Sequence, residues 1–329
     1  MLTHSNIMRY VLVASLATTA LFAANVSPAR AEILLGLTNT NAVVRFDSAA
    51  PTNILANTAL FGFDGAEERA VSFDYRPIGG TPLTVLTVGQ VDSDDVSIVG
   101  RLYDLDPTTG LLSNVRTLTA SFSTSVIYTI DFNPTGPVAL RVVGNDNSNY
   151  RVSNVGTGAT ATDTALSGDG IIVGGGDGLP VVGVAYSNND NNVLTGTTLF
   201  NIDRAGDRLA TIPVPNGGVT QQFANALGVD LSNTGFQEID ISGSGIAYGT
   251  FQLQGQGNVS RIFTLNLATG IATPTAVDNR VRLNNTNLVL RGIAALPAVA
   301  VPEINTMALL AVGLTAGRML LARRRKSGK

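Results

Sequence analysis

Most side chains in this sequence that could do chemistry are carboxylates, hydroxyls and arginines. Three carboxylates lie within four residues, at Asp92, Asp94 and Asp95. Calcium prefers such oxygen ligands and takes about six to eight of them, so neighbouring carbonyl groups would have to complete the site. Because no EF-hand spacing follows, we expect a solvated acidic loop here. We keep calcium, the one cofactor that the sequence suggests, as the alternative.

Three other aspartates, Asp74, Asp131 and Asp230, recur at corresponding places of a repeated pattern. They could ring a central channel, or they could form hydrogen bonds that build the repeats. Buried polar groups in proteins are almost always hydrogen-bonded, so a repeated aspartate is typical of a structural role. We therefore predict that these aspartates are structural. A separate asparagine-rich stretch at 284–287 predicts a turn, because asparagine tolerates left-handed backbone angles.

The residue types that are missing exclude much enzyme chemistry. The only histidine is His4, the only lysines are Lys326 and Lys329, and the chain has neither cysteine nor tryptophan. Residues 32–297 can therefore form no Ser-His-Asp triad, cysteine nucleophile, lysine Schiff base or zinc site built on imidazole and thiolate. Paired carboxylates of the glycosidase kind remain possible. We predict no particular catalytic residue and favour a binding role over an enzyme.

The charge of the same segment excludes another class of partner. Residues 32–297 carry 23 acidic and 13 basic side chains, a net charge near −10. Such a surface repels nucleic acid and anionic membranes. We expect no nucleic-acid partner, and the absence of cysteine means that a packed core, without disulfides, must stabilise the domain.

Five short segments with alternating apolar and polar residues indicate a repeated β-strand. The segments are Val44–Asp47, Tyr103–Asp106, Tyr150–Ser153, Phe200–Asp203 and Phe263–Asn266. Turn-forming residues follow three of these strands, at 107–110, 205–206 and 268–270. A second motif, which contains the repeated aspartates, precedes four of the strands, at 73–77, 130–134, 184–188 and 229–233.

The repeats predict how the chain closes. Four complete units run from about Val71 to Gly270, leaving a first strand near Val44 without a predecessor and a last one at Gly292–Ala294 without a successor. Joining those two strands makes a fifth unit, as in propellers that close their ring between the termini. We predict an all-β fold, a β-propeller of five blades. Six blades remain an alternative, because residues 54–73 could hold further strands.

The same repeats resemble those of the DUF4394 family. The resemblance runs from about Leu35 to Leu296 and is carried by 36–38, 101–110, 142–143, 185–188 and 227–230. It implies a propeller-like β fold and frequent export, and it implies no reaction.

The start of the chain has the order of a secretion signal. Arg9 precedes an apolar run from Tyr10 to Ala24, and a small-x-small site follows at Ala29 and Ala31. Signal peptidase recognises this order of charge, apolar stretch and small residues. We predict cleavage between Ala31 and Glu32, because the run is shorter than the roughly 20 residues that a bilayer span needs.

The end of the chain has three parts. Val301, Pro302 and Glu303 form a short motif, residues 304–322 form an apolar stretch of about one bilayer span, and basic residues follow. The basic residues are Arg323, Arg324, Arg325 and Lys326. Positive clusters stay cytoplasmic, so a single transmembrane helix here would leave the domain facing outward. Arg318 lies inside the stretch, near enough to the basic end to reach the headgroups.

This tail resembles the PEP-CTERM sorting signal of Gram-negative bacteria, although Ile304 stands where the family pattern has a second proline. The resemblance implies an exosortase-type processing enzyme as a partner. It also implies anchoring in the inner membrane before processing, with the domain facing the periplasm, and release to the cell surface or the medium afterwards.

Together these features divide the chain into a signal peptide at 1–31, a propeller domain at 32–297 and a linker with sorting tail at 298–329. We expect an exported surface or extracellular-matrix protein that acts as a non-enzymatic interaction module, with exopolysaccharide as a candidate partner. The alternative is an extracellular glycan hydrolase or lyase that uses carboxylates on a propeller scaffold.

Overall fold

The computed structural model describes residues 31–75, 83–91, 97–135, 139–168, 180–188 and 195–295. The sorting motif, the apolar tail, the basic end and most of the predicted signal peptide lie outside these residues, and so do Asp92, Asp94 and Asp95. Within the described residues, no helix is long and apolar enough to span a membrane.

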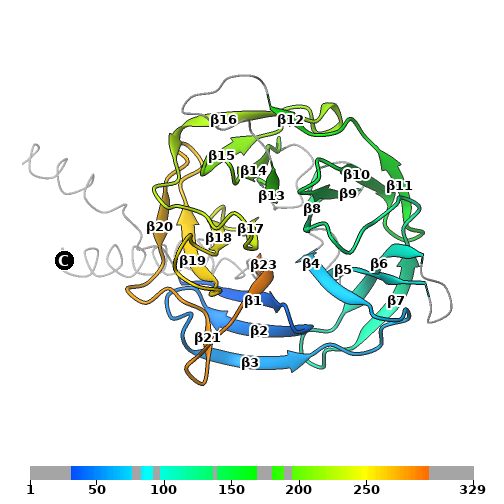
Figure 1. The fold of residues 1–329 in the computed structure, drawn as a ribbon, viewed down its shortest axis with the longest axis horizontal. Coiled ribbons are helices and arrows are strands. Elements are labelled where there is room, and N and C mark those ends of the chain that lie inside the picture. The colour runs from blue at the N-terminus through cyan, green and yellow to red at the C-terminus, as the bar shows by residue number, and fades with distance from the viewer. Residues whose placement is uncertain are drawn as a thin grey trace, which may run out of the picture. The chain divides into compact units, whose positions relative to one another are not determined.

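Most of the described strands form five sheets arranged around a common centre, four sheets with four strands and one with five, which is a five-bladed β-propeller (Figure 1). Blade I consists of β23 (Leu290–Ala295), β1 (Ile33–Thr38), β2 (Ala42–Asp47) and β3 (Ile54–Ala59). Blade II consists of β4 (Arg69–Tyr75), β5 (Leu83–Gln90), β6 (Ile98–Leu105) and β7 (Leu112–Thr117). Blade III consists of β8 (Tyr128–Asn133), β9 (Ala139–Gly144), β10 (Asn149–Asn154) and β11 (Ala159–Thr162).

Blade IV consists of β13 (Val181–Tyr186), β14 (Leu199–Asp203), β15 (Arg208–Thr211) and β16 (Val219–Ala226), with the short β12 (Ser167–Gly168) added parallel to β16. Blade V consists of β17 (Gln237–Ile241), β18 (Ala247–Phe251), β19 (Arg261–Leu265) and β20 (Ala272–Pro274). A small hairpin, β21 (Arg282–Leu283) and β22 (Thr286–Asn287), lies between blades V and I in sequence. The only helical turn described is the 3-10 turn η1 (Pro215–Gly217).

The ring closes as the sequence predicts, because β23 pairs antiparallel with β1 and becomes the innermost strand of blade I. Leu34 faces Ala295, and Gly36 faces Ile293, across this closure. Gly292 lets β23 approach blade II closely, since a Cβ atom there would meet a ring carbon of Phe73 at 2.8 Å. The prediction of five blades is confirmed. The extra strands considered at 54–73 are β3 and β4, the outer strand of blade I and the inner strand of blade II.

Burial falls from the centre of the ring to its rim. In the innermost strands β8 and β13 nearly every residue is buried, whereas the outermost strands β3, β7 and β16 are mostly exposed. An inner strand has neighbouring blades on both of its faces, so both sets of alternating side chains leave water.

Five apolar clusters hold the blades together, one between each adjacent pair. Blades II and III meet around Leu86 and Ile130, and blades IV and V meet around Ile202 and Ile239. The other three clusters are centred on Phe73 between I and II, on Phe46 between V and I, and on Val184 between III and IV. Burial of apolar surface at about 25 cal/mol per Å² makes these clusters the main source of stability.

The predicted turns are found. Gly110 and Gly270 have positive φ angles of 80–84° where β6 turns into β7 and β19 into β20. Asp106 and Asn266 cap these turns by accepting hydrogen bonds from the amides two residues on. At the hairpin of β21 and β22, Asn284 and Asn285 have φ angles of 50° and 67°, as a left-handed asparagine turn requires.

Two details of the repeat differ from the prediction. The segment Phe200–Asp203 is β14, the second strand of its blade, while the other four predicted segments lie in third strands. The motif at 229–233 does not lie in an innermost strand as the other three motifs do: Leu231 forms an isolated bridge with Leu253, and Asp230 is exposed. The innermost strand of blade V is β17, a few residues further on.

Candidate functional site

A ring of three buried aspartates surrounds the centre of the propeller. Asp74 on β4, Asp131 on β8 and Asp240 on β17 project from innermost strands and are at most 5% exposed. We call these three residues the carboxyl ring. Blades IV and I carry Ala185 and Ala294 at the corresponding places. Three of the five innermost strands therefore contribute a carboxyl group to the ring.

The carboxyl ring satisfies one backbone N–H group from every blade. Asp131 accepts a hydrogen bond from the amide of the next blade, while Asp74 and Asp240 each accept one from the next blade and one from the residue that follows them. The donors are Tyr186 to Asp131 (3.0 Å), Phe132 and Tyr75 to Asp74 (2.9 and 2.6 Å), and Ala295 and Ile241 to Asp240 (both 2.6 Å). The hydrogen bonds that the repeat predicted for Asp74 and Asp131 are found, and each aspartate accepts one of them from the neighbouring blade.

The carboxyl ring also has the geometry of a cation site, since one oxygen from each aspartate lies within 4.8 Å of the others. Burial raises the pKa of Asp74 well above its usual range, and the charge of Asp240 raises it further. Burial, followed by the charge of Asp74, likewise raises the pKa of Asp131. Burial and mutual repulsion therefore favour protonated carboxyl groups, while the backbone N–H donors oppose this effect in part, because they stabilise the ionised form.

A second polar layer lies one step back along the same strands. The Ser72 hydroxyl donates to Glu238 at 3.4 Å, and the Thr129 hydroxyl also donates to Glu238. Burial raises the pKa of Glu238 well above its usual range. Glu238 is 2% exposed, so this carboxyl group belongs to the interior and is not open to a ligand.

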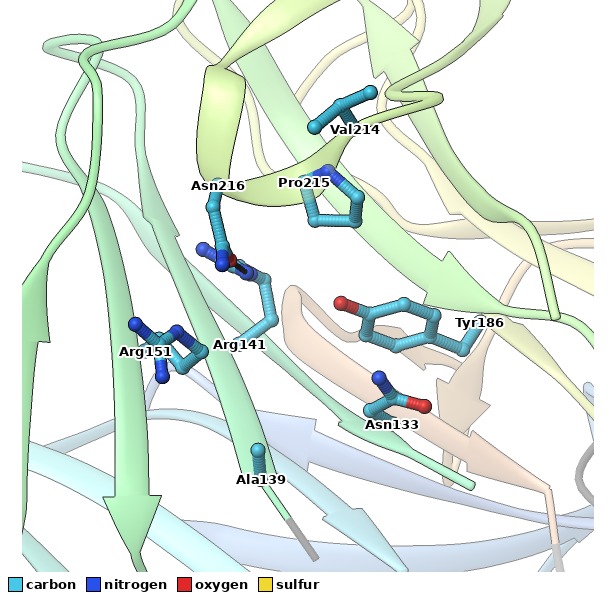
Figure 2. A pocket seen from close by; sticks show the side chains of 8 residues that line it. All are labelled: Asn133, Ala139, Arg141, Arg151, Tyr186, Val214, Pro215 and Asn216. Carbon is cyan, nitrogen blue, oxygen red and sulfur yellow. Dashed lines mark hydrogen bonds between the residues drawn. The ribbon is translucent and has the colours of Figure 1, made fainter. Parts of the chain in front are cut away.

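A polar opening lies at the finishing ends of β8 and β13. It is a cavity of about 260 Å³, lined by Asn133, Ala139, Arg141, Arg151, Tyr186, Val214, Pro215 and Asn216 (Figure 2). Blade III supplies the two arginines from β9 and β10, and blade IV supplies the tyrosine from the end of β13. The turn η1 covers one side with Pro215 and Asn216.

A shared carboxylate fixes the two arginines of this cavity. Asp163 accepts from Arg141 at 2.9 Å and from Arg151 at 3.2 Å, while Asn216 accepts from Arg141 at 2.8 Å. Arg141 is 3% exposed and its position is therefore rigid, whereas Arg151 is about one third exposed. The carboxylate offsets one of the two positive charges.

Tyr186 and Asn133 offer further polar atoms on the opposite wall. In Figure 2 the Tyr186 hydroxyl points towards Arg141, and the amide nitrogen of Asn133 is turned towards the tyrosine ring. The side-chain oxygen of Asn133 accepts bonds of 2.9 Å from the amide and hydroxyl of Thr135, which leaves the nitrogen for the cavity. Burial raises the pKa of Tyr186 against the opposing effect of Arg141, so the hydroxyl stays protonated.

A second cavity of about 340 Å³ adjoins the first and shares Asn133, Tyr186 and Pro215 with it. Hydroxyl groups dominate its other polar lining, at Thr197, Thr198 and Thr211. We call the two cavities together the groove. It combines amide, guanidinium and hydroxyl groups with the faces of a tyrosine and a proline, a set that suits the hydroxyl groups and apolar faces of sugars.

Sequence reasoning located only part of these features. It found Asp74 and Asp131, placed the third aspartate of the ring at Asp230 instead of Asp240, and found no residue of the groove. The signal for Asp240 was present, because Glu238-Ile239-Asp240-Ile241 alternates as Thr129-Ile130-Asp131-Phe132 does. Asp230 instead lies in the connection between blades IV and V, where it is exposed.

The fold and its axial ring define the class of protein: a closed five-bladed β-propeller with an antiparallel closure between its first and last strands. Residues 42–286 match the family model described as a domain of unknown function, DUF4394, and the chain belongs to that family. No curated protein matches the chain.

Among solved structures, the chain is similar to an auxiliary nutrient binding protein from Bacteroides thetaiotaomicron, at 14% identity and a TM-score of 0.37. The match covers 74% of this chain and 49% of that one, so the chain spans about half the length of that protein. A catalytically inactive virginiamycin B lyase from Staphylococcus aureus, solved with quinupristin, matches at 14% identity and a TM-score of 0.34, covering 79% and 73% of the two chains. At these scores the likenesses carry no information about activity.

Proposed function

We propose that this protein is an exported surface or extracellular-matrix protein whose propeller binds polysaccharide in the groove without cleaving it. The observation that carries the proposal is the composition of the groove: rigid hydrogen-bonding groups and two apolar faces, with no carboxylate among the described residues that line it. Glycan hydrolases of the common kinds need a pair of carboxyl groups flanking the bond that breaks.

The buried acids do not supply that pair. The carboxyl ring and Glu238 are bonded to backbone amides or to neighbouring hydroxyls and lie inside the propeller. This supports binding over the alternative of a carboxylate-dependent hydrolase or lyase. The absence of histidine, lysine and cysteine from residues 32–297 supports it as well.

The binding proposal is tested with the full chain, kept in mild detergent, and polysaccharide from its bacterial host. We expect saturable binding that Asn216→Ala weakens several-fold, because this change removes an acceptor that holds Arg141 in place. The matched control is Asn57→Ala, at an exposed site on the outer strand of blade I, which should bind like the wild type. Equal affinities for the two variants would reject the groove as the site.

Repeating the titration with and without calcium tests the acidic stretch at Asp92, Asp94 and Asp95. We expect no change in affinity, as for a solvated loop. A requirement for calcium would instead favour an ion site there.

The delivery of the protein rests on the two ends of the sequence, and we propose signal-peptide cleavage before Glu32 followed by exosortase-type processing near Val301–Glu303. The intact mass of the protein from membrane, surface and medium fractions tests this. A species that begins at Glu32, ends near the motif and lies outside the inner membrane is expected. A species in the inner membrane that keeps Arg323–Lys329 would contradict processing.

A further inference from the structure

A pair of arginines lies at the starting ends of the innermost strands, on the other side of the carboxyl ring from the groove. Arg69 begins β4, and Arg291 is the second residue of β23. With Phe236 and residues 124–128 they line a cavity of about 180 Å³. Four blades contribute to this cavity through β4, β8, β23 and the residue before β17, so it lies at one mouth of the propeller axis.

The contacts of the two arginines leave much of their hydrogen-bonding capacity unused. One terminal nitrogen of Arg69 donates to the carbonyl of Thr124, and one of Arg291 donates to the carbonyl of Ala70 at 3.2 Å. The Arg291 guanidinium also lies 5.2 Å from the centre of the Phe236 ring. The Nε atoms of both arginines are buried and have no partner among the described residues.

Among the residues that the structure describes, no carboxylate balances this pair. In the described part of the chain, no acidic group lies within 4.0 Å of either guanidinium, as an ion pair requires. Burial, and then the charge of Arg69, lower the pKa of Arg291 to about 10, and burial lowers that of Arg69. Two like charges held together at a partly desolvated site destabilise the folded protein unless an anion joins them.

The geometry points to an oxyanion-binding site in which Arg69 and Arg291 hold one carboxylate, sulfate or phosphate group at the mouth of the axis. The planar guanidinium forks suit such groups, and charge-assisted hydrogen bonds to them are the strong kind. The cavity has room for the charged group and part of the molecule that carries it. An acidic sugar of a polysaccharide and a free inorganic anion both offer this chemistry, and the experiment separates them.

In the test, the full chain is titrated with inorganic sulfate, with D-glucuronate and with glucose, which is the uncharged analogue of glucuronate. The buffer has low salt and contains no other oxyanion. We expect sulfate to bind at one site and to raise the melting temperature. Arg69→Gln and Arg291→Gln should each weaken sulfate binding at least tenfold. Arg45→Gln, at an exposed site of β2, should leave it unchanged.

The melting temperatures without anion separate binding from a purely structural role. Since each variant removes an unbalanced charge, neither should melt below the wild type in anion-free buffer. The site is refuted if sulfate gives no saturable binding, or if both variants respond to sulfate as the wild type does. Variants that melt lower without anion and yet keep the sulfate response would assign the arginines to structure alone.

Competition identifies the source of the anion. Glucuronate that displaces sulfate, where glucose does not, would assign the site to a carboxylated sugar. Sulfate binding that glucuronate leaves untouched would assign it to an inorganic anion. Because the probes are small anions and the site lies away from the groove, the result does not depend on polysaccharide binding there.

Discussion

Two pairs of arginines lie near the two ends of the propeller axis, and they are held in opposite ways. Arg141 and Arg151 in the groove share Asp163, and Arg141 is also bonded to the side chains of Asn149 and Asn216. Within the described residues, the partners of Arg69 and Arg291 are backbone carbonyls and an aromatic ring. The first pair is built into the fold, whereas the second keeps its charge available.

The difference distinguishes arginines that hold the fold in position from arginines that can bind a ligand. A guanidinium that is bonded on several sides to carboxylate and amide oxygens holds a wall in place, and its remaining donors can orient a neutral ligand. A guanidinium that has backbone carbonyls but no carboxylate among its described partners keeps an uncompensated charge at a partly desolvated site, and an anionic ligand group can compensate it. The carboxyl ring, between these two regions, consists of buried acids whose oxygens accept hydrogen bonds from backbone amides.

The largest expected effect follows from removing the carboxylate that the groove arginines share. Asp163→Ala leaves Arg141, 3% exposed, without its anionic partner, and should cost about 3 kcal/mol of unfolding free energy. Urea unfolding of the full chain, followed by fluorescence of its tyrosines, measures this. A loss below about 1 kcal/mol would remove the distinction between the two arginine pairs.

A smaller effect is expected when one arginine from each pair is replaced by glutamine. Arg141→Gln breaks bonds to Asp163, Asn149 and Asn216 and should cost about 2 kcal/mol. Arg291→Gln should change the unfolding free energy by less than about 0.5 kcal/mol in anion-free buffer, because it also removes an unbalanced charge. Urea midpoints of the two variants give the comparison, and equal losses would contradict it.

The carboxyl ring should make stability depend on pH. Its raised pKa values mean that the folded state binds protons more tightly than the unfolded chain, so stability is greatest near the ordinary carboxyl pKa and falls as pH rises towards the raised values. Between pH 5 and pH 8 the melting temperature should therefore decrease, by roughly 2–4 °C for each kcal/mol of linkage.

The matched variant for this prediction is Asp131→Asn, which keeps an oxygen for the Tyr186 amide but cannot ionise. Its melting temperature should depend less on pH than that of the wild type. Residues 32–297 contain no histidine to obscure this range. A melting temperature that rises from pH 5 to pH 8 in the wild type would show that the ring is ionised in the folded state.

The smallest effect is expected at the exposed member of the groove pair. Arg151 is about one third exposed, so its bond to Asp163 competes with water and salt. Arg151→Gln should cost less than about 1 kcal/mol, and 0.5 M sodium chloride should reduce the difference further. Thermal melting at low and high salt checks this. A loss of unfolding free energy as large as that of Arg141→Gln would contradict it and would show that Arg151 stabilises the fold as much as the buried arginine does.

The fold could be predicted from the sequence because its signals are local. Alternation marked third strands such as Tyr103–Asp106, and glycines such as Gly110 marked the turns. Ring closure followed from an unpaired strand at each end of the repeats. The error at Asp230 arose because Val229-Asp230-Leu231 copies the inner-strand pattern within a connection, and only the pairing of β17 with β18 identifies the true strand.

The candidate sites could not be predicted in this way, because the ring assembles them from distant parts of the chain. Arg69 and Arg291 meet only when β23 closes onto blade I beside β4. The groove likewise joins the end of β8, the end of β13 and the turn η1. Nothing in the local pattern of these residues separates a ligand-facing arginine from one that pairs with an aspartate elsewhere.

The most direct test of the central claim, that the propeller binds glycan without cleaving it, follows bound sugar and new reducing ends in one sample. The full chain is incubated for a day with polysaccharide from its host, beside the Asn216→Ala variant. Saturable binding in the wild type, weaker binding in the variant and a constant number of reducing ends are the expected result. A steady release of reducing ends or unsaturated sugar by the wild type would contradict the account and identify the protein as a hydrolase or lyase.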